Sequence, residues 1–594
     1  MALLLYLGFS LVVLLCAYLV IGRALARLFG LNSLENTPAF LMRDGLDYEP
    51  ARMSYLLPQH FSAIAAAGPI VGPILAGVYF GWGPAWLWIL VGSIFIGGIH
   101  DFTALIASVR HHGRTVAEIV REYMTARAYI LFLIFIWFAL VYVIVAFTDV
   151  TAGTFVQKAQ AAGGDAPGPA VATSSILYLL LAVVMGICLR FLNLNPIKAK
   201  LIFLPLVGLA IVIGPFIPLD LSHWIPEAQV QRVWGYSILV YCFLAAMAPV
   251  WMLLQPRGEL GGYFLYIVMA LAVAGISIGA LSGGLAIQQP FFKGWSTRDA
   301  FGQTNQLFPI LFITVACGAC SGFHSIIASG TTSKQLRCEQ DARPIGYGAM
   351  LLEGLFACLS LTTLMVLTRE GAEGKKPDFI YASGIADFGG RILAPFFSNP
   401  EQASSALLKF ALLCFATFVF DTLDACTRLA RYVLMELFGW KTRAQAALAT
   451  AACLLLPVVA VSLPGTEFNG RIQPLWSVFW NIFGSSNQLL AALTLLGVTV
   501  WLARTGKPCW FTLLPTLFMM CMSIWSLVLI ILPYLALWGG EAPIPAIRHL
   551  QFLVSFVLII LAGWLLLEAW ITWRTMIQPK LRRRVPQESY AETG

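Results

Sequence analysis

Charged residues are scarce in this sequence. Asp, Glu, Lys and Arg make up 11% of its 594 residues, whereas hydrophobic residues make up 59%. A soluble globular domain carries about 25% charged residues, so this chain lacks the charge that a water-facing surface requires, which excludes a soluble enzyme. The apolar runs are continuous and do not alternate with period two, which predicts membrane-spanning helices rather than the strands of a barrel.

Motifs for other kinds of chemistry are also missing. There is no Walker A sequence, which argues against ATP-driven pumping, and no H-x-x-x-H or H-E-x-x-H spacing that would indicate a zinc site. The twelve cysteines lie mostly in apolar stretches and are interpreted as small core residues. We therefore expect no metal and no cofactor. The N-terminal apolar stretch lacks a basic flank, and we expect a retained first helix rather than a cleaved signal peptide.

About fifteen apolar stretches are long enough to cross a membrane as helices. They cover residues 3–22, 60–80, 85–108, 129–152, 174–193, 200–219, 234–255, 261–284, 308–330, 345–367, 405–427, 444–464, 486–503, 510–534 and 548–573. With the N-terminus outside and the C-terminus in the cytoplasm, the cytoplasmic loops hold most of the 37 Lys and Arg residues. The sequence therefore predicts an all-α polytopic protein of the inner membrane, embedded in the lipid bilayer. The net charge of +8 then reflects topology, and no nucleic-acid partner is expected.

Two stretches resemble each other and indicate an internal repeat. The second span contains QHFSAIAAAGPIVGPILAG and the ninth contains CSGFHSIIASGTTSKQ, each with a His before a run of small residues that ends at a helix breaker. The copies are offset by seven spans, an odd number, so they lie upside down relative to each other, as in the inverted repeats of secondary transporters. Small residues also let membrane helices pack closely, which is the alternative interpretation of either stretch alone.

We accordingly expect residues 1–594 to form one transmembrane transporter domain, with an inverted-repeat core and two broken helices. Its parts are a peripheral first helix (1–35), a first repeat (60–219), a second repeat (308–503) and a basic cytoplasmic tail (574–594). The sequence leaves open whether each repeat holds five or seven helices.

The helix breakers mark candidate substrate-binding residues. They are Gly68, Pro69 and Gly72 in the second span, and Ser329, Gly330, Thr331 and Thr332 in the ninth. Proline removes a backbone donor and interrupts a helix, and the N-terminus of a half-helix carries partial positive charge that can hold a carboxylate. Because Lys334 follows closely, the second run is also interpreted as the cytoplasmic end of its helix.

Few ionisable residues lie within the apolar spans. They are His60, His100, Asp101, Asp149, His324, Glu353, Asp421 and Asp424, accompanied by the polar Asn487 and Gln488. A charged group at mid-membrane costs about 2.5–3.5 kcal/mol on insertion scales, so such residues are functional candidates by default. Imidazoles exchange protons near neutral pH. We expect the eight ionisable side chains named above to carry a coupling proton.

Each ionisable residue also has a structural interpretation. Asp149 and Asp424 lie close enough to span ends to be solvated or capping groups, and His60 fits a structural histidine near the inner interface. Adjacent residues of a helix point in different directions, so His100 and Asp101 are poorly arranged to share a metal ion with other histidines.

Several segments resemble the carbon starvation protein A family. They are NTPAF, DGLDYEPA, HFSAIAAAGPIVGPILA, GGIHDFTALIASVRHHGRT, APVWMLLQPRGEL, LFITVACGACSGFHSIIASGTTSKQL, RPIGYGAMLLEG, DTLDACTRLARYVLMEL and LWSVFWNIFGSSNQLLAAL, in this order between Asn36 and Leu496. The resemblance implies a bacterial inner-membrane transporter induced on nutrient limitation, with peptides or pyruvate as substrates. It also implies a five-plus-five inverted-repeat core of the amino acid–polyamine–organocation superfamily, whose first and sixth helices are broken.

Residues and resemblance together predict a secondary active transporter. We expect it to import a small carboxylate nutrient, pyruvate or a short peptide, by proton symport during carbon starvation. Two alternatives remain at this stage: sodium-coupled transport of the same substrates, and a membrane nutrient sensor that does not transport. The sequence does not address the oligomeric state.

Overall fold

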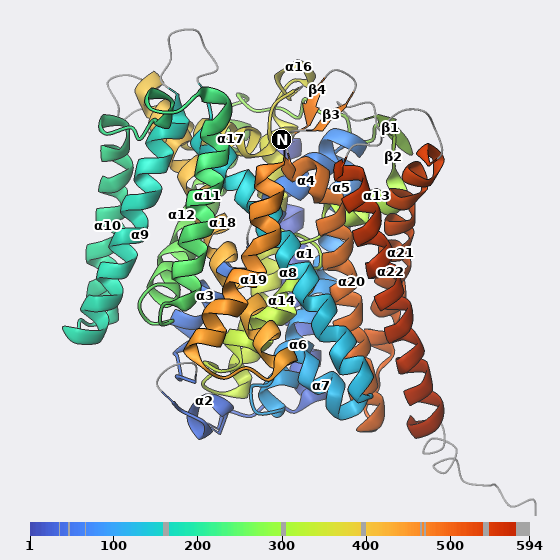
Figure 1. The fold of residues 1–594 in the computed structure, drawn as a ribbon. Coiled ribbons are helices and arrows are strands. Elements are labelled where there is room, and N and C mark those ends of the chain that lie inside the picture. The colour runs from blue at the N-terminus through green and yellow to red at the C-terminus, as the bar shows by residue number, and fades with distance from the viewer. Residues whose placement is uncertain are drawn as a thin grey trace, which may run out of the picture.

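The computed structural model describes most of the chain as a bundle of long helices (Figure 1). It describes residues 1–34, 36–44, 48–65, 67–158, 166–298, 304–372, 374–393, 400–463, 466–468, 471–473, 475–538 and 546–577. Most of the predicted basic tail, residues 578–594, lies outside the described residues.

Thirteen helices in the described part of the chain are long and apolar enough to cross a membrane. Twelve of them are α1 (Ala2–Phe29), α8 (Ala126–Phe155), α9 (Pro167–Phe191), α10 (Pro196–Ile213), α11 (Glu227–Met247), α12 (Leu254–Leu281), α15 (Ala349–Met365), α18 (Pro400–Phe438), α19 (Arg443–Ser462), α20 (Leu475–Arg504), α21 (Trp510–Leu537) and α22 (Ala546–Thr572). The thirteenth joins α5 (Trp82–Gly92) and α6 (Gly98–Arg110) through the π-helix η1 (Ser93–Gly97). The all-α prediction is therefore confirmed.

Shorter elements connect these helices. They are the helices α2 (Pro38–Leu41), α7 (Val116–Tyr123), α16 (Arg369–Ala372) and α17 (Pro377–Leu393), and the antiparallel hairpins β1 (Ser296–Arg298) with β2 (Thr304–Gln306) and β3 (Thr466–Phe468) with β4 (Arg471–Gln473). In Figure 1, α7 and α2 lie at the lower end of the bundle and α17 at the upper end. These are called the α7 end and the α17 end below.

Two predicted spans are broken. The second span consists of α3 (Met53–Ile64) and α4 (Gly68–Phe80), which meet at an angle of 43°. The ninth consists of α13 (Leu307–Thr314) and α14 (Gly322–Ile327), separated by the non-helical residues 315–321, and α14 continues into the π-helix η4 (Ala328–Thr332). Of the fifteen predicted spans, thirteen are continuous helices long and apolar enough to cross a membrane and one is a bent pair, whereas the ninth consists of two helices too short to count as such a span among the described residues.

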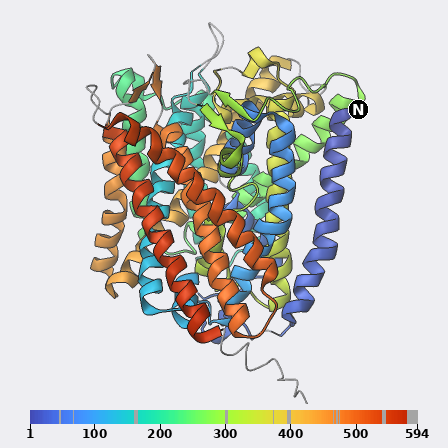
Figure 2. The ribbon, with the colours of Figure 1, turned by 90° about the vertical axis from the view of Figure 1, so that its right-hand side faces the viewer.

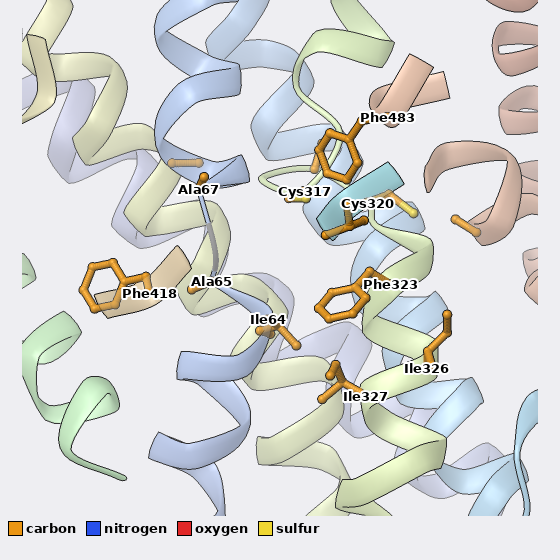
Figure 3. Close-up of a cluster of buried hydrophobic side chains, with 14 of the residues drawn as sticks. Ile64, Ala65, Ala67, Cys317, Cys320, Phe323, Ile326, Ile327, Phe418 and Phe483 are labelled. Carbon is orange, nitrogen blue, oxygen red and sulfur yellow. The ribbon is translucent and has the colours of Figure 1, made fainter. Parts of the chain in front are cut away.

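The two breaks face each other in the interior (Figure 3). Ala65 and Ala67, on either side of the first break, lie near Cys317 and Cys320 of the second, and Phe323, Phe418 and Phe483 surround them. A Cβ atom added at Gly68 would lie 2.3 Å from Cys317 Cβ. The start of α4 therefore packs directly on the unwound stretch 315–321.

Burial separates a core from a periphery. In the spans that contain α5–α6, α15 and α20, 89% of the residues in the most apolar 18-residue stretch are buried. The same share is 28% for α1 and 22% for the span of α10. The α9–α10 hairpin stands at one edge of the bundle in Figure 1, and α1 stands at an edge in Figure 2. By contrast, α11 packs on α8 and α12 packs on α3 and α18.

Candidate functional site

A buried cluster of acids and imidazoles joins the two broken helices. Asp101 on α6 is its centre: its Oδ1 lies 2.7 Å from His100 Nδ1 and its Oδ2 lies 2.8 Å from His324 Nδ1 on α14. The other ring nitrogen of His324, Nε2, lies 3.3 Å from Oε2 of Glu353 on α15. All four side chains are fully buried.

His60 adds the first broken helix to this region. It lies on α3, one turn before the break, and its Nδ1 lies 2.9 Å from Thr332 Oγ1 on η4. Both residues are buried. We call His60, His100, Asp101, His324 and Glu353 the acid–imidazole cluster; the sequence predicted all five as proton-coupling residues.

Several atoms of the acid–imidazole cluster have no hydrogen-bond partner within the described part of the chain. They are Nε2 of His60, Nε2 of His100 and Oε1 of Glu353, whereas His324 Nε2 and Glu353 Oε2 face each other as an ion pair at 3.3 Å. Nearly all buried polar groups in native proteins are hydrogen-bonded, so each exception requires an explanation. Ring nitrogens and carboxylate oxygens are groups at which a proton can bind.

The expectation that His100 and Asp101 diverge is wrong. Although they are neighbours on α6, their side chains meet at 2.7 Å. Both imidazoles bound to Asp101 use Nδ1, so the carboxylate holds two rings in fixed orientation. Among the described residues, no group of three or more His, Cys, Asp and Glu side chains is arranged to hold a metal ion.

A second buried cluster surrounds Arg257, which lies in the first turn of α12 and is fully buried. Its Nε lies 2.5 Å from Asp421 Oδ1, and its Nη1 pairs with Asp424 and with Tyr241 OH. Tyr241 on α11 also donates to Asp424 Oδ2 at 2.7 Å. These contacts offset part of the cost of burying the charges, although Arg257 Nη2 and Asp424 Oδ1 have no hydrogen-bond partner among the described residues.

The Arg257 cluster also includes Ser62 on α3, whose hydroxyl donates to Asp421 Oδ2 at 2.5 Å. Asp421 thus connects the half-helix α3 to α12 and α18. Asp421 and Asp424, both predicted as proton carriers, lie three residues apart on one face of α18 and share a single cation.

Sequence reasoning missed Arg257 because it placed the residue in a loop between the predicted spans 234–255 and 261–284. The structure begins α12 at Leu254, which puts Arg257 inside the bundle. A signal was present: two predicted intramembrane carboxylates three residues apart require a buried cation.

Asp149 lies elsewhere, on α8, where its Oδ1 accepts a hydrogen bond of 2.8 Å from Gln231 Nε2 on α11. Asn487 and Gln488 of α20 hold the second break. Asn487 Oδ1 accepts from the backbone N–H of Phe323 at 2.9 Å, its amide bonds to Ser321, and Gln488 donates to the carbonyl of Phe312. Asn487 therefore caps the N-terminus of α14 from a neighbouring helix.

The predicted substrate-binding residues lie beside the breaks. Gly68 and Pro69 form the first turn of α4, so the interruption precedes them, after the end of α3 at Ile64. Gly72 packs against the second break, since an added Cβ would lie 2.5 Å from the carbonyl oxygen of Thr314.

The run Ser329, Gly330, Thr331 and Thr332 lies in η4, at the α7 end of the broken helix. The unwound stretch of that helix is 315–321, so the interpretation of the run as a helix end is the one that the structure supports. Ser329 and Gly330 line a cavity of ≈ 180 Å³.

Comparison with known proteins gives consistent results. The model of the family "Carbon starvation protein CstA" matches residues 1–377 and 372–526. The chain is 30% identical to the peptide transporter CstA of Campylobacter jejuni, covering 85% of this chain and 76% of that protein. It is 29% identical to the pyruvate/proton symporter BtsT of Escherichia coli, with coverages of 84% and 77%.

Among solved structures, a manganese transporter from Eremococcus coleocola matches with a TM-score of 0.50 and 12% identity, covering 90% of this chain and 99% of that one. This likeness concerns the fold alone. The names of the relatives agree with a transporter and not with an enzyme or a sensor. The chain belongs to the carbon starvation protein CstA family, and it is a membrane transporter with many spans.

Proposed function

We propose that this transporter imports a small carboxylate nutrient, pyruvate or a short peptide, by proton symport, and that the acid–imidazole cluster carries the proton. One observation carries the proposal: Asp101 bridges two imidazoles, one of them on the second broken helix, and that second imidazole also faces the carboxylate of Glu353 at 3.3 Å. A proton that moves among these atoms changes the contacts of the broken helix. In this way the movement of the proton would be coupled to the transport of the substrate.

The hydrogen bonds of the Arg257 cluster favour a proton over sodium as the coupling ion. Sodium in transporters is held by oxygen atoms, including carbonyls of unwound backbone. The Asp421 oxygens already accept from Arg257 and Ser62, and Asp424 pairs with Arg257 and Tyr241. In the acid–imidazole cluster the carboxylate of Asp101 is flanked by ring nitrogens. Sodium coupling is the alternative that the experiment below distinguishes.

For the substrate, we propose the region of the two breaks. Gly68, Pro69 and Gly72 would line it from α4, whose N-terminus offers partial positive charge to a carboxylate. Ser329, Gly330, Thr331 and Thr332 of η4 would form its α7-end wall. The printed names of the relatives, peptide transporter and pyruvate/proton symporter, support a carboxylate-bearing substrate.

The packing supports two inverted repeats with a revised boundary. α12 packs on α3 as α20 packs on α14, and α11 packs on α8 as α19 packs on α18. We propose that the first repeat extends from α3 through α12, with the edge hairpin α9–α10 inserted, and that the second runs from α13 through α20. Each repeat then has five core spans. We also propose the inner membrane of a bacterium, with the α7 end cytoplasmic, because Arg110, Arg114 and Lys334 gather there.

Uptake by proteoliposomes tests the proposal. The purified chain is reconstituted, and accumulation of labelled pyruvate and of labelled alanylalanine is followed under an inward proton gradient and, separately, under an inward sodium gradient. We expect accumulation under the proton gradient in the absence of sodium. Uptake only with sodium would overturn the coupling, and no uptake of either compound would overturn the substrate class.

A further inference from the structure

The turn between α9 and α10 carries basic side chains that no carboxylate balances. Arg190 lies in the last turn of α9 and Lys198 in the first turn of α10, and both are exposed. Within the described part of the chain, neither forms an ion pair with a carboxylate. A third cation, Lys200, is balanced, because its Nζ lies 2.7 Å from Oε1 of the buried Glu259 on α12. The turn therefore keeps two uncompensated positive charges.

The loop between α11 and α12 adds an aromatic ring to this turn. The loop packs on α9, since a Cβ added at Gly186 would lie 2.6 Å from the carbonyl oxygen of Met252. The Arg190 guanidinium lies 5.8 Å from the ring centre of Trp251, and the Phe191 ring centre lies 5.7 Å from that of Trp251. Basic and Trp side chains at the ends of membrane helices typically lie at the level of the lipid headgroups.

The outward side of α10 next to this turn is apolar. Ile197, Leu201 and Ile202 are exposed, and the α9–α10 hairpin stands at one edge of the bundle (Figure 1). In a membrane this side faces the lipid tails. The 25 residues of α9 span roughly 37 Å, which exceeds the hydrocarbon thickness of about 30 Å. The last turn of α9 therefore reaches the headgroup layer.

The uncompensated charges select between lipid classes. A phosphatidylcholine or phosphatidylethanolamine headgroup carries its own cation beside the phosphate, so it brings no net negative charge to the turn. A phosphatidylglycerol headgroup brings one phosphate without a cation, and Arg and Lys side chains are strong partners of phosphate. The N-terminus of α10 adds partial positive charge at the same turn. A free phosphate ion would meet the same cations but has no tails to cover the apolar side of α10.

We infer that the turn between α9 and α10 is a docking surface for an anionic phospholipid. Arg190 and Lys198 pair with its phosphate, and its acyl chains lie along the exposed side of α10. Among the described residues, Lys200 and Glu259 form the one ion pair that ties this edge hairpin to the rest of the bundle. A lipid held at the turn adds a second link between the hairpin and the loop that carries Trp251.

Native mass spectrometry of the purified full chain tests the inference, with dioleoylphosphatidylglycerol and dioleoylphosphatidylcholine as probes. We expect the first phosphatidylglycerol molecule to bind at least about tenfold more tightly than phosphatidylcholine, since each basic side chain near an anionic headgroup strengthens binding about fivefold. The double variant Arg190→Gln/Lys198→Gln should bind both lipids alike. The matched control, Lys441→Gln/Arg443→Gln, removes two exposed cations from the turn between α18 and α19 and should keep the preference.

Three results would overturn the inference. They are equal binding of both lipids by the unaltered protein, a preference that survives in the Arg190/Lys198 double variant, and an equal loss of preference in the control, which would indicate a generally basic end. Inorganic phosphate in excess should leave phosphatidylglycerol bound, and its displacement would identify a site for the free ion instead. If the double variant does not fold, each single Gln variant replaces it and should reduce the preference about fivefold.

Discussion

Asp101 Oδ2 and His324 Nδ1 lie 2.8 Å apart although 223 residues separate them in the chain. The contact ties α6 to α14, the α7-end piece of the second broken helix. Because both side chains are fully buried, no solvent competes for the bond. The position of a broken helix is thereby connected to the charge of one carboxylate, and the proposed coupling of proton movement to a change of shape rests on this connection.

Replacing Asp101 by Asn is expected to remove proton-driven accumulation. The amide keeps the size of the side chain but cannot take up a proton or pair with a protonated His324. We expect the initial rate of gradient-driven uptake to fall at least about tenfold, a loss of about 1.4 kcal/mol or more. The measurement is uptake by proteoliposomes. The exposed pair residue Asp387, changed to Asn, is the matched control, and full accumulation by the Asp101 variant would make this residue structural.

Removal of the Arg257 guanidinium is expected to destabilise the protein strongly. Arg257→Met leaves Asp421 and Asp424 buried without a cation, and breaking a buried pair costs about 3–5 kcal/mol. Denaturant unfolding in detergent measures the loss. The triple variant that also carries Asp421→Asn and Asp424→Asn should recover most of it, because no buried charge remains. Equal instability of the single and triple variants would argue against this electrostatic account.

We expect Asn487 to stabilise the protein by capping the N-terminus of α14. Asn487→Ala removes the acceptor of the Phe323 N–H, and lost caps cost about 1 kcal/mol. Asn487→Asp keeps that acceptor and is expected to retain more of the stability. Thermal unfolding of the three proteins gives the comparison, and identical midpoints for the wild type and the Ala variant would refute the capping role.

Gly68 is expected to tolerate no side chain. An added methyl group would lie 2.3 Å from Cys317 Cβ and force the two breaks apart, and overpacking of this kind costs about 1–3 kcal/mol. Gly208 of α10 is the control, since nothing lies within 4 Å of its added Cβ. Gly208→Ala should leave the unfolding midpoint unchanged or raise it, because Ala favours helix. A harmless Gly68→Ala would mean that the breaks do not pack as described.

The spans and the candidate proton carriers were accessible from sequence for a simple reason. A membrane helix must be apolar along its length, so each span appears as a run, and a rare polar residue within it stands out. His100, Asp101, His324 and Glu353 were found in this way, and the structure brings them into direct contact.

The positions of the breaks were less accessible. Pro69 predicts an interruption of the helix, but a proline is well tolerated in the first turn of a helix, and here it lies in the first turn of α4. The unwound stretch 315–321 contains no proline and reads as an ordinary apolar segment. Contacts from α20, through Asn487 and Gln488, hold it open, and such tertiary contacts leave no local signal.

Proton movement triggered by substrate tests the central claim most directly. Proteoliposomes containing the protein and an internal pH dye receive substrate from outside, without any imposed gradient or sodium. We expect the interior to acidify as substrate enters, with no acidification for the Asp101→Asn variant. Substrate entry without acidification, or acidification that requires sodium, would contradict a proton route through Asp101 and His324.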